Sequence, residues 1–370
     1  MSDTESGQSN NPEQRLQGLR DGIDQADRDI QEALNRRVAL VQGVAEVKLA
    51  AGGNDAVYYR PEREAQVLRR VKNDNPGPLD DNTVARLFRE IMSACLALEK
   101  PVQVAYLGPE GTYTQSAALK QFGSSMQGLP VASIDQIFSA VERGETAYGV
   151  VPVENSTEGP VNQTLDCLIN SSLSICGEVE LVIHHNLLAQ KADVKPTVIY
   201  SHQQSLAQCR NWLAQNYPNV DQVAVSSNAE AARLAAEQPN CMAIAGSTAA
   251  TLYQLEVLES CIEDSRDNTT RFLVLGTQDV GISGEDKTSI IVTTKNRPGA
   301  LAEILQLFQE NEINLAKIVT RPSAEATWAY MFFIDFEGHG KDASVQNVME
   351  QMDEKSIAVK WLGSYPVAAI

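Results

Sequence analysis

The sequence predicts a chain of three segments: an all-helical segment, an α/β segment and a small unit of mixed strands and helices. Apolar residues recur at three- and four-residue steps through the first hundred residues. Beyond Val102, short apolar strands alternate with helical patterns up to about Gly276. From Lys287 the order becomes strand, helix, strand, strand, helix, strand. We therefore expect a disordered tail and three domains, with the boundaries 1–13, 14–100, 101–278 and 286–366.

The helical segment begins with one long helix. Its apolar residues keep the helical period from Leu16 to Val44 without a proline, and Gly52-Gly53-Asn54 end it. A helix of about 35 residues presents more apolar surface than a compact monomer covers, so we expect it to pack against its own copy in a homodimer. Two shorter helices are predicted from Pro61 to Lys72 and from Val84 to Leu98.

Composition excludes several classes of protein. The chain has 370 residues and a net charge of -18, which argues against nucleic acid or an anionic membrane as a partner. No apolar run reaches the roughly 18 residues of a membrane span. The six cysteines form no CxxC pair, which indicates reduced thiols and a cytoplasmic protein. Four histidines without ligand spacing argue against zinc, and we expect neither metal nor cofactor.

Cations gather in the helical segment. Residues 14–100 hold as many basic as acidic residues, although the whole chain is acidic, which suggests an anionic ligand for some of them. Arg37 and Lys48 lie eleven residues apart, close to three helical turns, and so point the same way. Arg20 lies roughly a quarter-turn off that line and would serve a second site. The alternative is that these cations are ordinary solvated surface charges.

Four stretches of this segment resemble the all-helical chorismate mutases of the AroQ type. They are Leu19-Arg20-Asp21-Gly22-Ile23-Asp24, Asn35-Arg36-Arg37, Val47-Lys48 and Arg60-Pro61-Glu62-Arg63-Glu64. The resemblance implies that Arg37, with Arg20 of the partner subunit, grips the two carboxylates of chorismate. Lys48 would be catalytic and would donate to the ether oxygen as the C–O bond breaks. The implied substrate-binding set is Arg20, Arg37, Arg60, Arg63, Glu64 and Cys95.

Glu99 stands where some members of that family have an amide donor. It follows Cys95 by one turn on the apolar face of the third predicted helix. An ionised carboxylate would repel the charge that develops on the ether oxygen, whereas a protonated carboxyl would donate to it. Burial raises the pKa of a carboxyl group, so Glu99 is a candidate catalytic acid. The alternative is an ordinary exposed glutamate.

The α/β segment carries four polar clusters close to predicted strands. They are Gly108–Thr114, Val151–Gly159, Tyr200–Gln204 and Asn268–Phe272. Ligands of open α/β sheets bind beyond the carboxyl ends of the strands, and helix N-termini there suit anions. Together, in this order, the clusters resemble prephenate dehydratase from Val102 to about Gly276. The resemblance implies two α/β lobes, similar to periplasmic binding proteins, with the substrate between them. Two lobes fit a crossover of this chain near Leu181–Leu188 and a return near Asp264–Thr270.

That resemblance makes Thr270 the catalytic donor to the hydroxyl that leaves prephenate. The substrate-binding residues that it implies are Thr112, Glu154, Asn155, Ser156, Ser201, His202, Gln208 and Arg271. Strand alternation turns Arg271 away from the face of Thr270, so a structural salt bridge is an equal alternative. His202 is a candidate acid, with a hydrogen-bonded loop histidine as the alternative.

The C-terminal unit has the ferredoxin-like strand order. Arg297-Pro298-Gly299-Ala300-Leu301 at a strand-to-helix turn, with Thr320-Arg321-Pro322 after the next strand, resembles an ACT domain. The resemblance implies that Gly299, Ala300, Leu301 and Arg321 bind an amino-acid effector, L-phenylalanine, between paired domains. Val319 replaces the usual acidic residue of the second motif. The alternative is a dimerisation unit without a ligand.

The three resemblances imply an enzyme of phenylalanine biosynthesis with two activities. It would rearrange chorismate to prephenate, then decarboxylate and dehydrate prephenate to phenylpyruvate, with feedback inhibition by L-phenylalanine. The other hypothesis is a non-enzymatic amino-acid sensor with a helical dimerisation segment. The presence of Arg37, Lys48 and Thr270 together favours the enzyme, because a sensor needs neither set of catalytic residues.

Overall fold

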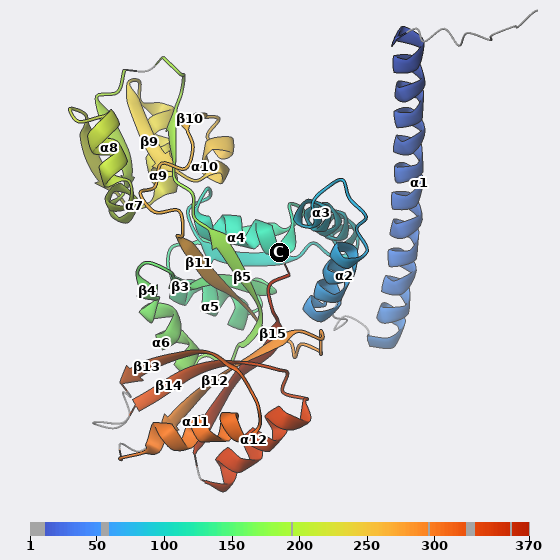
Figure 1. The fold of residues 1–370 in the computed structure, drawn as a ribbon, viewed down its shortest axis with the longest axis vertical. Coiled ribbons are helices and arrows are strands. Elements are labelled where there is room, and N and C mark those ends of the chain that lie inside the picture. The colour runs from blue at the N-terminus through green and yellow to red at the C-terminus, as the bar shows by residue number, and fades with distance from the viewer. Residues whose placement is uncertain are drawn as a thin grey trace, which may run out of the picture. The chain divides into compact units, whose positions relative to one another are not determined.

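The computed structural model describes residues 12–52, 59–193, 195–294, 297–322, 330–355 and 357–369 (Figure 1). The chain divides into two compact units. The first comprises residues 1–58 with Leu98–Lys100, and the second comprises Tyr59–Ala97 with Pro101–Ile370. Within the described ranges, no helix has both the length and the apolar character that a bilayer span requires.

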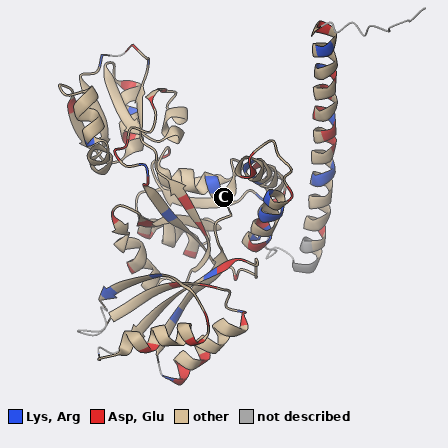
Figure 2. Cartoon of the chain, in the orientation of Figure 1, with Lys and Arg blue, Asp and Glu red and all other residues tan. Residues whose placement is uncertain are grey.

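The predicted long helix is present as α1 (Pro12–Gly52), which has 41 residues. Basic and acidic residues are interspersed along it (Figure 2). Its apolar residues are largely uncovered in the single chain; those exposed are Leu16, Leu19, Ile23, Ile30, Leu40, Val44 and Val47. Burying one such side chain contributes about 1.5–3 kcal/mol, so this stripe is a strong candidate for contact with another helix.

Helices α2 (Pro61–Asn73) and α3 (Asp81–Glu99) follow. A proline in the first turn of α2 suits helix initiation, since its missing N–H would have no partner there. Side chains of both helices bond to later parts of the chain. Arg69 donates to the carbonyls of Ser283 and Glu285, and Arg89 donates to the carbonyl of Lys120 at 2.6 Å. Up to Ala97, these helices therefore belong to the second compact unit.

The α/β segment forms two lobes. The sheet of the first lobe has the order β2-β1-β3-β11-β5, and β4 pairs with β3. Its elements are β1 (Gln103–Leu107), α4 (Tyr113–Phe122), β2 (Gln127–Val131), α5 (Ile134–Glu142), β3 (Tyr148–Asn155), β4 (Gly159–Pro160), α6 (Asn162–Asn170), β5 (Ser174–Val182) and β11 (Thr269–Gly276). Strand β11 returns from the second lobe and runs antiparallel between β3 and β5. It therefore places Thr270 beside the end of β3.

The sheet of the second lobe has the order β10-β6-β9-β7-β8. Its elements are β6 (Asn186–Ala189), β7 (Val198–His202), α7 (Gln203–Gln208), α8 (Arg210–Asn216), β8 (Asp221–Val225), α9 (Asn228–Glu237), β9 (Cys241–Ala245), α10 (Ser247–Leu252) and β10 (Glu256–Glu259). Two crossovers, residues 183–185 and 260–268, join the lobes. They fall in the regions that the sequence predicted.

The C-terminal unit has the predicted strand and helix order, and its sheet runs β13-β14-β12-β15. The elements are β12 (Asp286–Thr294), α11 (Ala300–Glu310), β13 (Leu315–Pro322), β14 (Tyr330–Glu337), α12 (Ala343–Glu354) and β15 (Ala358–Pro366). The sequence predicts the third of these strands from Trp328 to Phe336, and the start of that range lies outside the described residues. One face of the sheet packs on α11 and α12 through a core that includes Ile290, Phe308 and Val348.

The other face of this sheet packs on the first lobe. Ile291, Phe333, Leu362 and Tyr365 share one core with residues of the first lobe such as Ile175. Gly363 allows the close approach of β15 to β5, because a Cβ atom there would lie 2.4 Å from the carbonyl oxygen of Ile175. Through this shared core, the sheet of the first lobe, which includes β3 and β11, packs against the sheet of the C-terminal domain.

Candidate active site

A cavity of about 720 Å³ opens between residues of the two lobes. First-lobe residues that line it include Thr112, Tyr113, Asn155 and Thr270, and second-lobe residues include His202, Gln208, Ser227 and Asn228. The lining therefore contains five residues that the sequence nominated: Thr112, Asn155, His202, Gln208 and Thr270. The cavity therefore brings together residues of all four polar clusters that the sequence predicted.

Thr270 is held by Asn155. The two residues are register partners across β11 and β3, and Asn155 Nδ2 donates to Thr270 Oγ1 at 2.9 Å. The orientation of the amide is fixed, since its Oδ1 accepts from the backbone N–H of Thr157 at 3.0 Å. A hydroxyl that accepts one hydrogen bond keeps its own hydrogen for another. Thr270 can therefore donate to a molecule in the cavity.

A chain of hydrogen bonds continues from Asn155 across the cavity. Asn155 Nδ2 also donates to Asn268 Oδ1 at 2.8 Å, and Asn268 Nδ2 donates to Gln208 Oε1 at 3.2 Å. Gln208 Oε1 lies 2.7 Å from His185 Nε2, and His185 Nδ1 lies 2.8 Å from the hydroxyl of Tyr113. This chain connects both lobes with the crossovers between them.

His185 and Tyr113 are cavity residues that sequence reasoning missed. The side chain of His185 is buried, and burial lowers its pKa, so the ring is neutral near pH 7. Since Gln208 Oε1 can only accept, Nε2 of the ring carries the hydrogen and Nδ1 accepts. A signal was available: the pair His184-His185 lies within the predicted crossover between the lobes.

Among the described residues, no Lys, Arg, Asp or Glu side chain lines the cavity, yet it offers groups that suit an anion. Two helix N-termini contribute to the lining instead. Thr112 caps α4 by accepting from the backbone N–H of Gln115, and Ser227 caps α9 by accepting from that of Glu230. Helix N-termini are favourable places for carboxylates, because their N–H groups lack partners and the helix dipole is positive there.

Four further predicted residues of this segment do not line the cavity. Ser201 is fully buried and donates to the carbonyl of Ile244 at 2.8 Å. Ser156 Oγ donates to the carbonyl of Asp267 at 2.9 Å and so ties β3 to a crossover. Glu154 and Arg271 point to the C-terminal domain, where their carboxylate and guanidinium groups meet opposite charges. Arg271 thus has the salt-bridge environment given above as its alternative.

The predicted mutase residues lie on three helices. In the first unit, Arg20 of α1 is exposed and Arg37 is half-buried. One guanidinium nitrogen of Arg37 is buried and has no hydrogen-bond partner among the described residues. The side chain of Lys48 lies outside the described residues, and Glu99, at the end of α3, is half-buried.

The other mutase candidates belong to the second unit. Arg60 and Arg63 are exposed, and Cys95 is buried. Glu64 Oε1 lies 3.3 Å from Arg89 Nε and also meets the hydroxyl of Tyr59. Burial raises the pKa of Glu64, against the effect of Arg89.

The predicted effector residues occupy two places in the C-terminal domain. Gly299 has a φ of 84° at the start of α11, a left-handed conformation that favours glycine, and Ala300 and Leu301 follow it. Among the described residues, apart from its chain neighbours, none has an atom within 4 Å of where a Cβ atom of Gly299 would be. Arg321, at the end of β13, forms an ion pair of 2.5 Å with Asp166 of α6.

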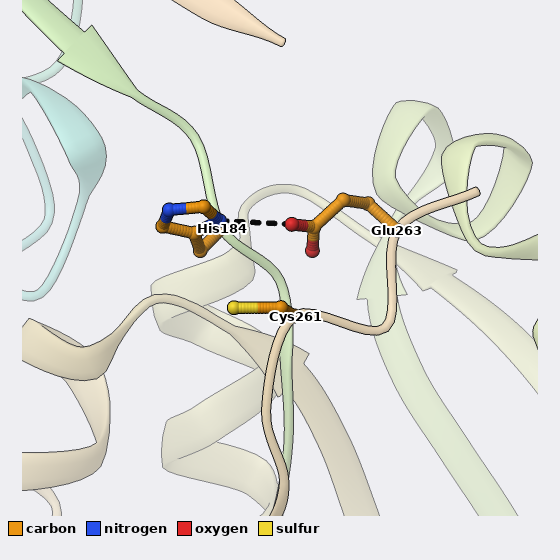
Figure 3. Close-up of side chains that lie close together, drawn as sticks. All are labelled: His184, Cys261 and Glu263. Carbon is orange, nitrogen blue, oxygen red and sulfur yellow. Dashed lines mark hydrogen bonds and ion pairs between the residues drawn. The ribbon is translucent and has the colours of Figure 1, made fainter. Parts of the chain in front are cut away.

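The crossovers also carry a group with metal-binding side chains. The imidazole of His184, the thiol of Cys261 and the carboxylate of Glu263 offer ligand atoms within 4.8 Å of one another (Figure 3). His184 Nδ1 already lies 2.8 Å from Glu263 Oε1, and Glu263 Oε2 accepts from the backbone N–H of His185 at 2.8 Å. Through these contacts His184 and Glu263 link the two crossovers. Imidazole, thiol and carboxylate groups are also ligands for a divalent ion.

Three family models match the chain in the order of its domains. Chorismate mutase type II matches residues 19–100, prephenate dehydratase 104–280 and the ACT domain 288–354. Among solved structures, a prephenate dehydratase from Arthrobacter aurescens in complex with L-Phe is 32% identical, with a TM-score of 0.65, and the match covers 72% of this chain and 90% of that one. The prephenate dehydratase from Staphylococcus aureus is 26% identical, with a TM-score of 0.60 over 71% of this chain and all of that one.

Relatives match over nearly the full length. A bifunctional chorismate mutase/prephenate dehydratase from Pseudomonas aeruginosa is 52% identical and covers 96% of this chain and 99% of its own. The protein of the same description from Neisseria gonorrhoeae is 49% identical over 95% of this chain and 97% of its own. The chain therefore belongs to the bifunctional chorismate mutase/prephenate dehydratases, the enzymes of phenylalanine biosynthesis that rearrange chorismate to prephenate and convert prephenate to phenylpyruvate.

Proposed function

We propose that prephenate is dehydrated in the cavity between the two lobes, with Thr270 as the donor to the leaving hydroxyl. The observation that carries this proposal is the hydrogen bond from Asn155 Nδ2 to Thr270 Oγ1. It occupies a lone pair of the hydroxyl and leaves the Thr270 O–H free to point at the substrate.

The chemistry makes modest demands on this donor. In prephenate, the bond from the ring to the carboxylate breaks and releases CO₂, while the C–O bond on the opposite side of the ring breaks. The leaving hydroxyl takes up one proton, supplied in the end by the solvent, and departs as water. The electrons of the broken C–C bond complete the aromatic ring, which provides the driving force. The enzyme must orient the substrate and stabilise the hydroxyl as it leaves.

The carboxylates of prephenate would be held by the N-termini of α4 and α9, with help from Thr112, His202 and Gln208. Hydroxyl, amide and backbone N–H groups suit this task because they hold an anion without forming a strong ion pair to the carboxylate that must leave as CO₂. Ser201 and Ser156 would support the site through the backbone contacts described above.

Chorismate would bind to Arg37 of one subunit and Arg20 of the partner subunit, with Lys48 and Glu99 at the ether oxygen. One buried guanidinium nitrogen of Arg37 has no partner among the described residues, which supports this role because buried donors in proteins are normally satisfied. The uncovered apolar stripe of α1 supports a homodimer formed through this helix. The boundaries 14–100, 101–278 and 286–366 would then separate the two catalytic domains from the regulatory one.

L-phenylalanine would act as a feedback inhibitor at Gly299, Ala300 and Leu301, near Arg321. The open space beside Gly299 supports a ligand there, and so does the complex of the Arthrobacter aurescens relative with L-Phe. The protein would work in the cytoplasm, where its six free cysteines would stay reduced.

A coupled assay tests these assignments. Chorismate is supplied, and prephenate and phenylpyruvate are followed with and without L-phenylalanine, while light scattering gives the mass of the active species. We expect both products, loss of phenylpyruvate formation with phenylalanine, and a dimer. A monomer with full mutase activity would contradict the shared mutase site.

A further inference from the structure

The ends of β3 and β11 present two pairs of residues on opposite faces. Thr270 pairs with Asn155, and both line the cavity. The next pair along the same ladder is Arg271 with Glu154, and these side chains point to the C-terminal domain. Successive residues of a strand face opposite ways, so the two pairs share one stretch of backbone. A displacement of Glu154 therefore moves the stretch of backbone that orients the side chain of Asn155.

The C-terminal domain meets this second pair with charges of opposite sign. Lys317 of β13 forms an ion pair with Glu154. Asp335 of β14 forms one with Arg271 over 2.5 Å. Lys317 and Asp335 are themselves register partners across β13 and β14. Four charges of alternating sign thus close a ring between the two domains.

The ring is anchored on its Arg271 side. Arg271 Nε bonds to Glu178 Oε2 at 2.8 Å, and Glu178 in turn binds Lys287 Nζ at 2.7 Å. Asp335 is further held by the hydroxyl of Ser289 at 2.6 Å. Arg271 therefore has three partners that fix it in place, since Tyr365 also accepts from it at 3.0 Å.

The Glu154 side of the ring is simpler. Among the described residues, Lys317 is the cation that faces the Glu154 carboxylate, and both side chains are 27% exposed. A space of about 30 Å³ beside them, lined by Glu154, Lys317, Arg271 and Asp335, leaves room for Glu154 to move when its partner is removed. Loss of Lys317 should therefore displace the end of β3, whereas β11 would stay fixed by Arg271.

We propose that Lys317, a residue of the ACT domain, is a positioning residue for prephenate dehydration. It holds Glu154, and Glu154 holds the end of β3 so that the amide of Asn155 meets Thr270. The proposal rests on the proposed role of Thr270. Glu154 then acts from behind the site and does not touch the substrate. Because Arg321 and Lys317 lie on the same face of β13, a ligand bound near Arg321 would act on the cavity through this contact.

The test compares Lys317→Met with a matched control, Lys360→Met, in the full-length chain. Lys360 of β15 crosses the same interface, but its Nζ donates to the carbonyls of Ile169 and Ser171 at the end of α6, away from β3 and β11. We expect Lys317→Met to lower the kcat for prephenate about 10- to 100-fold, the scale of a misplaced catalytic group, with KM little changed. Lys360→Met should keep the wild-type kcat, and both variants should keep chorismate turnover.

Two further variants separate the possible outcomes. Glu154→Gln combined with Lys317→Met should be no slower than Glu154→Gln alone, since the lysine acts through the glutamate. Lys317→Arg keeps the charge and should recover most of the rate. Lys317→Gln also removes the ion pair with Glu154, so it should be slow and carries the test if Lys317→Met does not fold.

The proposal is overturned if a folded Lys317→Met or Lys317→Gln variant keeps the wild-type kcat, or if Lys360→Met loses as much as Lys317→Met. Thr270→Val, measured alongside, tells the two proposals apart. A fully active Thr270→Val variant would refute the role of Thr270. A slow Thr270→Val variant beside a fully active Lys317→Met variant would refute the positioning role alone.

Discussion

Asn155 Nδ2 donates to Thr270 Oγ1 over 2.9 Å, and this contact couples two residues that lie 115 positions apart in the chain. It joins the end of β3 to the start of a strand that returns from the second lobe. Thr270 is the acceptor in this hydrogen bond, and in the function proposed above it is the donor toward the substrate.

Thr270→Val should lower dehydratase kcat by about 10²–10⁴, because the variant keeps the volume of threonine but has no O–H to donate. Thr270→Ser should keep part of the rate, since serine retains the hydroxyl but loses the methyl group that fixes its rotamer. Steady-state kinetics on prephenate give the answer, and the chorismate reaction of the same samples is the control. Wild-type rates for both variants would move the donor elsewhere, with His202 as the next candidate.

His185 should make the stability of the enzyme depend on pH. Burial lowers its pKa in the folded protein, so the unfolded chain binds a proton near pH 6.5 that the folded chain does not. The free energy of unfolding should therefore be highest above that pH. As the pH falls below it, the loss should approach at most about 1.4 kcal/mol per pH unit until the folded pKa is reached.

Urea unfolding at several pH values from about 7.5 to about 5 measures this slope. This range brackets the ordinary histidine pKa of about 6.5. His185→Gln should be less stable at neutral pH, since it loses the contact with Tyr113, but its slope should be shallower. His202→Gln controls for the substitution itself at another histidine of the cavity. An unchanged slope in His185→Gln would show that other groups produce the pH dependence.

Arg37→Ala should abolish chorismate turnover and leave the dehydration of supplied prephenate nearly intact. The reason is that Arg37 would grip a carboxylate of chorismate, whereas the dehydratase cavity is lined by residues 107–272 of the second unit. Arg37→Lys keeps the charge but not the two-pronged hydrogen bonding, so it should recover only a small part of the activity. Equal loss of both activities in a folded dimer would contradict the separation of the two sites.

Gly299→Ala should weaken inhibition by L-phenylalanine while prephenate turnover continues. Any side chain at a φ of 84° strains the turn before α11, and the added methyl group enters the open space proposed for the ligand. Calorimetric titration of the full-length protein with phenylalanine measures the affinity directly. Gly284→Ala, at another positive-φ glycine with open space around it, is the matched control and should bind phenylalanine normally. Equal affinity in both variants and the wild type would place the effector elsewhere.

The C-terminal domain cannot be removed without consequence for the first lobe. Its sheet covers Ile175 and Leu273 in a shared core, and it supplies the partners of Arg271. A truncation before Lys287 would leave Arg271 and Glu178 without these contacts. Point substitutions such as Gly299→Ala therefore test regulation more cleanly than deletion does.

The sequence by itself determined the three segments, their element types and five of the polar residues that line the cavity. Periodicity was enough to predict α1 and the strand and helix order of the C-terminal domain. Where one face of a helix or strand is buried, apolar residues recur with the period of that element. Thr270 lies in a local motif close to a strand end, whereas Gln208 was implied by the resemblance to prephenate dehydratase alone.

Only the tertiary structure decided which face each motif residue serves. Glu154 and Asn155 are neighbours in one motif, yet one meets the C-terminal domain and the other the cavity. His185 and Tyr113 belong to the site because the crossover and the start of α4 meet in space. Such contacts depend on strand register and on the packing of lobes, which join residues far apart in the chain, and no local pattern of residue types records them.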